Sequence, residues 1–197
     1  MSDPRARIAG KLTMRPQRFA RPAIGIAGIA LLITGAAAVG AKPSDACSAS
    51  EYRQFDFFAG DWDTYDVSDS TRIVARNLVT PMLDGCAIRE KYVQSDGLHG
   101  ESFSTYDAVR RSWHQSWVTN RGTLLLLDGG VVGGRMVLTA TEHATDGSSS
   151  LLRGVWWTKG KSVRERAERS KDGGATWSPV FDIVFWPHGS RDRTAGR

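Results

Sequence analysis

The stretch FDFFAGDWDTYD, residues 55–66, joins an aromatic cluster to a Gly-x-Trp step and then alternates polar with apolar side chains. Alternation with a period of two is typical of a β-strand that buries one face. We expect the three phenylalanines to plug one end of a β-barrel, Gly60 to allow a tight turn, and Trp62 to begin the first strand with its ring across the closed end. These plug residues are Phe55, Phe57 and Phe58.

Short alternating runs separated by Gly, Asp, Asn and Ser continue this pattern to the end of the domain, with no sustained helical period. A single helical turn over 50–55, capped by Ser48 or Ser50, is expected to precede the stretch. Turn signals such as Asp128-Gly129-Gly130 separate the runs. Strands are predicted near 61–67, 71–80, 86–94, 99–106, 112–119, 123–128, 131–141, 151–158, 162–170 and 176–186.

The predicted fold class is therefore all-β: a single up-and-down meander of about ten strands closed into an antiparallel barrel. Closure removes the exposed edges that such a sheet would otherwise carry. A barrel of this size is also wide enough to hold a ligand.

The N-terminal part of the chain predicts export. Residues 1–22 carry six bases and one acid, and an apolar run at 23–41 ends in Val39-Gly40-Ala41. We interpret 1–41 as a signal peptide cleaved after Ala41. An uncleaved membrane anchor is the alternative, since a run of about 20 apolar residues can span a bilayer. The predicted location is periplasmic or secreted.

The remaining chain is divided into a linker at 42–50, a barrel domain at 51–188 and a disordered tail at 189–197. Without the first 41 residues, the formal charge of +5 falls to zero, with 20 bases and 20 acids. A neutral domain gives no support to nucleic-acid binding, which needs a basic surface. A membrane contact is expected only through an uncleaved N-terminal segment.

Cys47 and Cys86 are the only cysteines of the chain. In an exported protein they predict one disulfide, which would close a loop of about 40 residues and stabilise the fold by roughly 3–4 kcal/mol. Two unpaired buried thiols are the alternative.

Four motifs carry a resemblance to a known group of proteins. In chain order they are FDFFAGDW (55–62), LDGCAIREKY (83–92), WHQSWVTN (113–120) and SKDGGATW (170–177). Together they resemble a family of exported bacterial domains of unknown function with a lipocalin-like, calycin-type barrel, distantly similar to lipocalins, fatty-acid-binding proteins and nitrobindins. The chain departs from that pattern at Phe58, where tryptophan is expected, and at Ala167, where a large apolar residue is expected.

The strand expected over 86–94 places Glu90 and Tyr92 on one face, which we expect to point inward. A carboxylate inside a barrel is costly unless it is paired or hydrogen-bonded. Two interpretations stay open: Glu90 orients a ligand, or it is satisfied by a neighbour such as Arg153 or by water.

Two indoles flank an amide on one face of the strand expected over 112–119, as in the apolar wall of a ligand pocket. Ordinary barrel core is an equally good interpretation of this face. The candidate ligand-binding residues are Trp62, Glu90, Tyr92, Trp113, Gln115, Trp117 and Arg153.

The sequence holds no recognisable catalytic signature. Its four histidines are far apart, so no metal site is predicted, and no cofactor is expected; haem would have to use His188, beyond the last strand. Residues 170–177 match a single Asp-box, which predicts a structural hairpin.

The expected function is binding of a small apolar or amphipathic molecule in the barrel lumen. The alternative is an envelope interaction domain with a filled barrel and an exposed apolar patch. A catalytic role for Glu90 would need a buried carboxylate with no cationic partner beside an open cavity.

Overall fold

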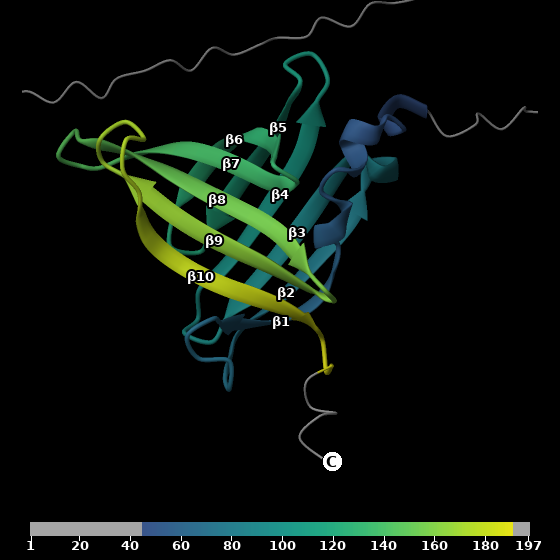
Figure 1. The fold of residues 1–197 in the computed structure, drawn as a ribbon, viewed down its shortest axis with the longest axis horizontal. Coiled ribbons are helices and arrows are strands. Elements are labelled where there is room, and N and C mark those ends of the chain that lie inside the picture. The colour runs from purple at the N-terminus through teal and green to yellow at the C-terminus, as the bar shows by residue number, and fades with distance from the viewer. Residues whose placement is uncertain (1–44, 191–197) are drawn as a thin grey trace, which may run out of the picture. The chain divides into compact units, whose positions relative to one another are not determined.

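Each strand pairs with its neighbours along the chain and the last strand pairs with the first, which closes an antiparallel barrel (Figure 1). The structure, a computed structural model, describes residues 45–190. The strands are β1 (Gly60–Asp66), β2 (Ile73–Met82), β3 (Ala87–Gln94), β4 (His99–Asp107), β5 (Ser112–Thr119), β6 (Leu124–Val132), β7 (Arg135–His143), β8 (Ser149–Lys159), β9 (Ser162–Ser170) and β10 (Ser178–Pro187). This confirms the predicted ten-strand meander.

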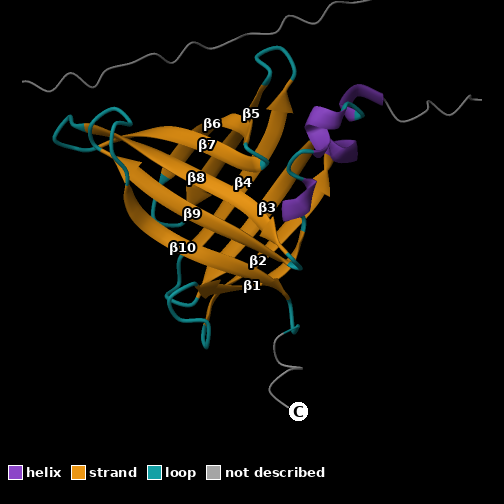
Figure 2. Ribbon diagram, in the orientation of Figure 1, coloured by secondary structure: helices purple, strands orange, loops and turns teal. Residues whose placement is uncertain are grey.

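Four short 3₁₀ helices lie before and between the first strands: η1 (Asp45–Cys47), η2 (Ser50–Arg53), η3 (Asp56–Phe58) and η4 (Leu83–Gly85). They gather at one side of the barrel in Figure 2. The helical lead-in is confirmed, but the serine cap is wrong, because Ala49 is the N-cap of η2 and no side chain caps it. No helix between residues 45 and 190 has the length and apolar character that crossing a bilayer requires. The signal peptide or anchor predicted for 1–41 lies outside the described residues.

The turn predicted at Asp128-Gly129-Gly130 is wrong, because these residues lie inside β6. The chain turns instead at Gly133 and Gly134, both with positive φ. Gly129 serves a close approach: a Cβ there would lie 2.1 Å from the carbonyl oxygen of Val137 on β7.

The aromatic plug is confirmed at the end where β1 begins and β10 ends. Phe55 and Phe58 are fully buried and stack on each other. Phe55 meets Trp113 and Trp156 edge-on at ring-centroid distances of 5.7 and 5.6 Å. Burying each phenylalanine contributes about 1.5–3 kcal/mol, so the plug is a large part of the core at this end.

The role of Gly60 in the Gly-x-Trp step differs from the one predicted. Gly60 does not have positive φ, so it makes no special turn. A Cβ at Gly60 would lie 2.4 Å from Cζ2 of Trp62, and the Trp62 indole N–H donates to the carbonyl oxygen of Phe58 at 3.0 Å. The missing side chain therefore makes room for the indole that holds the plug to β1.

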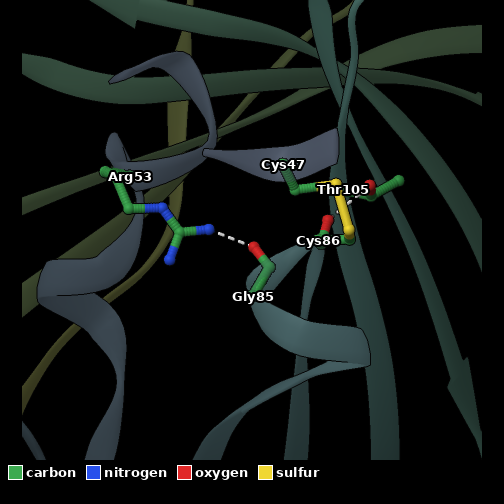
Figure 3. Close-up of a disulfide and its surroundings, with 5 residues drawn as sticks. All are labelled: Cys47, Arg53, Gly85, Cys86 and Thr105. Carbon is green, nitrogen blue, oxygen red and sulfur yellow. Dashed lines mark hydrogen bonds between the residues drawn. A yellow bond between two sulfur atoms is a disulfide. The ribbon is translucent and has the colours of Figure 1, made fainter. Parts of the chain in front are cut away.

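A disulfide joins Cys47 in η1 to Cys86, which precedes β3, with the two Cα atoms 5.0 Å apart (Figure 3). The Thr105 hydroxyl donates to the Cys86 carbonyl oxygen at 2.8 Å, and Arg53 donates to the carbonyl oxygen of Gly85. The lead-in segment is thus fixed to the closed end of the barrel by one covalent bond and a neighbouring polar contact.

Candidate functional site

The barrel contains a cavity of about 430 Å³. Its walls come from the end of β1, the start of β2 and the start of β10, whereas the plug packs against the opposite ends of these strands. The cavity therefore lies towards the unplugged end. Its lining residues are Asp66, Val74, Glu90, Tyr92, Gln94, Leu98, Gln115, Trp117, Leu125, Leu127, Leu152, Gly154, Trp156, Glu165, Ala167, Phe181 and Ile183.

The sheet is less complete around the mouth of this cavity. β6 and β7 are in register only from Asp128 to Val132 on β6, so residues 124–127 pair with β5 alone. β10 pairs with β1 only from Ile183 onward, although it begins at Ser178. In both the β6–β7 pair and the β1–β10 pair, the strands are paired near the plugged end and unpaired toward the mouth.

Four of the seven residues predicted for the site line the cavity: Glu90, Tyr92, Gln115 and Trp117. Strand parity thus placed the polar floor of the lumen correctly. Trp113 and Trp62 are buried deeper, in the cluster around the plug, and Trp113 donates its indole N–H to Oε1 of Gln54 at 3.1 Å. Neither tryptophan lines the cavity.

Arg153 is a correction to the prediction, because its side chain lies on the outside of the barrel. Leu152 and Gly154, on either side of it in β8, face the cavity. Arg153 pairs with Glu168 at 2.7 Å and lies 3.9 Å above the centroid of the Trp177 ring. It can therefore satisfy neither Glu90 nor a ligand in the lumen.

Glu90 accepts its hydrogen bonds from neutral side chains. The Asn77 amide donates to Oε1 at 2.9 Å and the Ser102 hydroxyl to Oε2 at 2.8 Å. The Gln115 amide donates in turn to the hydroxyl oxygens of Ser104 and Ser102 at 3.1 and 3.4 Å. Burial raises the pKa of Glu90 above its usual value, while the hydrogen bonds from Ser102 and Asn77 oppose that rise. No Lys, Arg or His is among the residues that line the cavity around it.

Glu165 is a second carboxyl group in the lumen, and the prediction missed it. It lies on β9 opposite Trp156 and lines the cavity. Burial first, and then the charge of Glu90, raise the pKa of Glu165 well above its usual value. The indole N–H of Trp156 opposes that rise, but it makes no hydrogen bond of good geometry. Strand parity could have found Glu165, since it shares a strand face with Ala167, the position where a large apolar residue was expected.

Tyr92 stands above the two carboxyl groups on the β3 wall. Burial raises its pKa, and the charges of Glu165 and Glu90 add to the rise, so the phenol keeps its proton and donates to Oε1 of Gln94 at 3.2 Å. The Tyr92 ring meets Trp117 edge-on at 5.9 Å. This wall offers aromatic surface beside the acids.

Small residues keep the lumen open. A Cβ at Gly100 would lie 2.2 Å from Trp117, and one at Gly154 would lie 2.4 Å from Trp156, so each glycine lets an indole lie flat against the wall. Ala167 pairs with Gly154 on one side and Phe181 on the other. A large residue at this position, which the family resemblance led us to expect, would project into the space that now forms the cavity.

Asp66 supplies a third carboxylate to the cavity lining, at the end of β1. The Ser68 hydroxyl and backbone N–H both donate to its Oδ1, at 2.5 and 2.8 Å. These bonds lower the pKa of Asp66, so this carboxylate is a fixed negative charge near the mouth.

The remaining motifs have structural roles on the outer surface. His188 lies against Asp63, with Nδ1 3.0 Å from Oδ1, near the plugged end and outside the cavity lining. No cluster of three or more His, Cys, Asp or Glu side chains suited to a metal ion occurs within residues 45–190. The Asp-box forms the predicted β9–β10 hairpin: Asp172 accepts from the Thr176 backbone and hydroxyl, and Trp177 donates to the Gly174 carbonyl.

The fold and the cavity define a closed ten-strand antiparallel barrel with one plugged end and one hollow end, compatible with a calycin-like fold. A comparison of the chain with models of known protein families gave no match, and a comparison with curated proteins gave none either.

Proposed function

We propose that this chain is an exported carrier or receptor that binds one small apolar or amphipathic molecule in the hollow end of its barrel. The cavity carries the proposal, because its volume falls in the range of about 300–1,000 Å³ that is usual for small-molecule sites. Aliphatic and aromatic side chains form most of its lining, and a few polar groups converge on its floor. We also propose that the chain is a member of the lipocalin-like family that the four sequence motifs resemble.

Binding of the neutral fluorescent probe N-phenyl-1-naphthylamine tests it, with quenching of tryptophan fluorescence as a second signal. We expect one probe per barrel, and we expect Ala167→Phe to abolish binding by filling the cavity while circular dichroism stays unchanged. The matched control is Leu126→Ser, which removes an exposed leucine from the outer face of the same barrel.

Those two variants also separate the proposal from its main competitor, an interaction domain. Four exposed apolar side chains on neighbouring strands favour that second candidate: Phe103, Val118, Leu124 and Leu126. If Leu126→Ser removes probe binding and Ala167→Phe does not, the probe binds this outer surface and the luminal site is refuted.

Export is the other part of the proposal. A disulfide is compatible with an oxidising compartment, and the basic and apolar segments of 1–41 have the order of a signal peptide. Sequencing the N-terminus of protein recovered from the periplasm should give Lys42 as the first residue. Recovery of the intact chain in the membrane fraction would favour the anchor instead.

A further inference from the structure

All the charged residues that line the cavity are acids. Three of its residues are acidic, Asp66, Glu90 and Glu165, and none is Lys, Arg or His. A buried carboxylate is normally paired with a cation or neutralised by a proton, because removing a charge from water is costly. Within the described chain no basic side chain lines the cavity. Glu90 and Glu165 can therefore be neutralised only by protons or by a cation from outside the protein.

Hydrogen bonding at the floor is incomplete. The Asn77 amide donates to Glu90, while its own carbonyl oxygen is buried without a donor. Native proteins leave few buried polar atoms unpaired. The indole N–H of Trp156, opposite Glu165, is an unpaired donor, whereas the Asn77 oxygen beside Glu90 is an unpaired acceptor, so hydrogen bonding around the two glutamates is incomplete and a ligand could add to it.

The walls above the floor suit the rest of such a ligand. Trp117, Tyr92 and Phe181 present aromatic surface to the cavity, and aromatic faces attract organic cations. Leu125 and Leu152 line the same space and can pack against an alkyl chain.

We propose that the ligand of this barrel is an amphipathic organic cation, an alkyl or aryl ammonium whose charged head lies at Glu165 and Glu90 and whose apolar part extends towards the mouth. This inference rests on the proposed luminal site and specifies its ligand class. A primary ammonium group has three N–H donors, which suits the carboxyl oxygens of Glu165 and Glu90. The fixed charge of Asp66 near the mouth would favour the approach of a cation.

Binding would also move a proton. Glu165 shares the cavity with the titratable groups of Glu90 and Tyr92 on β3 and Asp66 on β1, and none of these is cationic. An ammonium ion at Glu165 favours the ionised carboxylate, so a proton held there in the free protein is released to the buffer on binding. A neutral ligand of the same shape gives no such release.

The test compares octan-1-amine, octan-1-ol and octanoate, each competing with N-phenyl-1-naphthylamine at pH 7.5. We expect the amine to bind at least tenfold more tightly than the alcohol and octanoate to bind most weakly. Calorimetry in buffers of different ionisation enthalpy should show proton release with the amine alone. Glu165→Gln should reduce amine affinity to that of the alcohol and abolish the release.

Glu101→Gln is the matched control, because Glu101 is a carboxylate on the outer face, paired with Arg89, and its loss should leave all three affinities unchanged. Glu165 is chosen over Glu90 because no hydrogen bond of good geometry depends on it in the described structure. Equal binding of amine and alcohol, or tighter binding of octanoate, overturns the cationic ligand while leaving the luminal site intact. Failure of the neutral probe itself to bind overturns the luminal site as well.

Discussion

The disulfide should stabilise this protein chiefly at the closed end, and removing it gives a measurable test of how the plug is held. Cys47 and Cys86 are 39 residues apart, and closing a loop of that length stabilises the folded state by about 4 kcal/mol in the chain-entropy model. The chain-entropy model places this gain in the unfolded chain, and in the folded state the bridge also ties η1 to the residue before β3. We therefore expect the double variant Cys47→Ser/Cys86→Ser to lose about 2–4 kcal/mol of unfolding free energy.

Urea unfolding followed by tryptophan fluorescence measures the total loss, and hydrogen exchange measured by mass spectrometry locates it. Exchange should rise most in residues 48–59, before β1, and least in β7 and β8, which lie far from the bridge in the chain. The wild-type protein in excess reducing agent should match the variant. Titration of the denatured, unreduced protein should find no free thiol. Two free thiols, or a loss of protection spread evenly over the barrel, would refute the view that the disulfide fixes residues 48–59 to the closed end.

Three further predictions follow from the walls of the barrel. Arg153→Ala should cost about 1 kcal/mol or less, since it removes a partly exposed ion pair and a stack on Trp177, and probe affinity should not change. Gly100→Ala should destabilise by about 1–3 kcal/mol by displacing the Trp117 indole, whereas Gly130→Ala, where no atom lies within 4 Å of the added Cβ, should stay within about 0.5 kcal/mol of wild type; equal effects in urea unfolding would contradict this. The pKa of Glu165 is raised in the folded state, so the folded protein holds more protons than the unfolded one above pH 4.5, and stability should fall as pH rises from there. Glu165→Gln should flatten that slope in thermal melts between pH 5 and 8; an unchanged slope would mean that Glu165 does not titrate across this range.

Strand periodicity was sufficient to predict most of this fold. The alternation in β3 and β5 placed Glu90, Tyr92, Gln115 and Trp117 on the inner face because side chains in a strand alternate strictly between two faces. The prediction for Arg153 was wrong because its contact with Glu90 was inferred from charge alone and not from strand alternation. The parity of β8, with Leu152 and Gly154 facing inward, excludes that contact.

Glycine was harder to interpret from sequence, because one residue type serves two physical purposes. At Gly133 it supplies positive φ for a turn, but at Gly129 it lets two strands approach closely and at Gly60 it makes room for an indole. The sequence pattern of Asp128-Gly129-Gly130 is that of a turn, and only the position of β7 shows that it is not one. The sequence predicted a barrel wide enough for a ligand but not the shape of its cavity, which depends on the small side chain of Ala167 opposite Phe181.

The closed end and the hollow end of the barrel contribute differently to its stability. The closed end has continuous strand pairing, the disulfide and a buried aromatic core. The hollow end has two pairs of strands that are joined over only part of their length, an unfilled volume, and carboxyl groups whose pKa values burial has raised. Each feature of the hollow end lowers the stability of the free protein, and a cation with an apolar tail would offset the cavity and the buried acids together. The plug and the disulfide lie at the opposite end of the barrel from the cavity, so they can stabilise the fold whether or not the cavity is occupied.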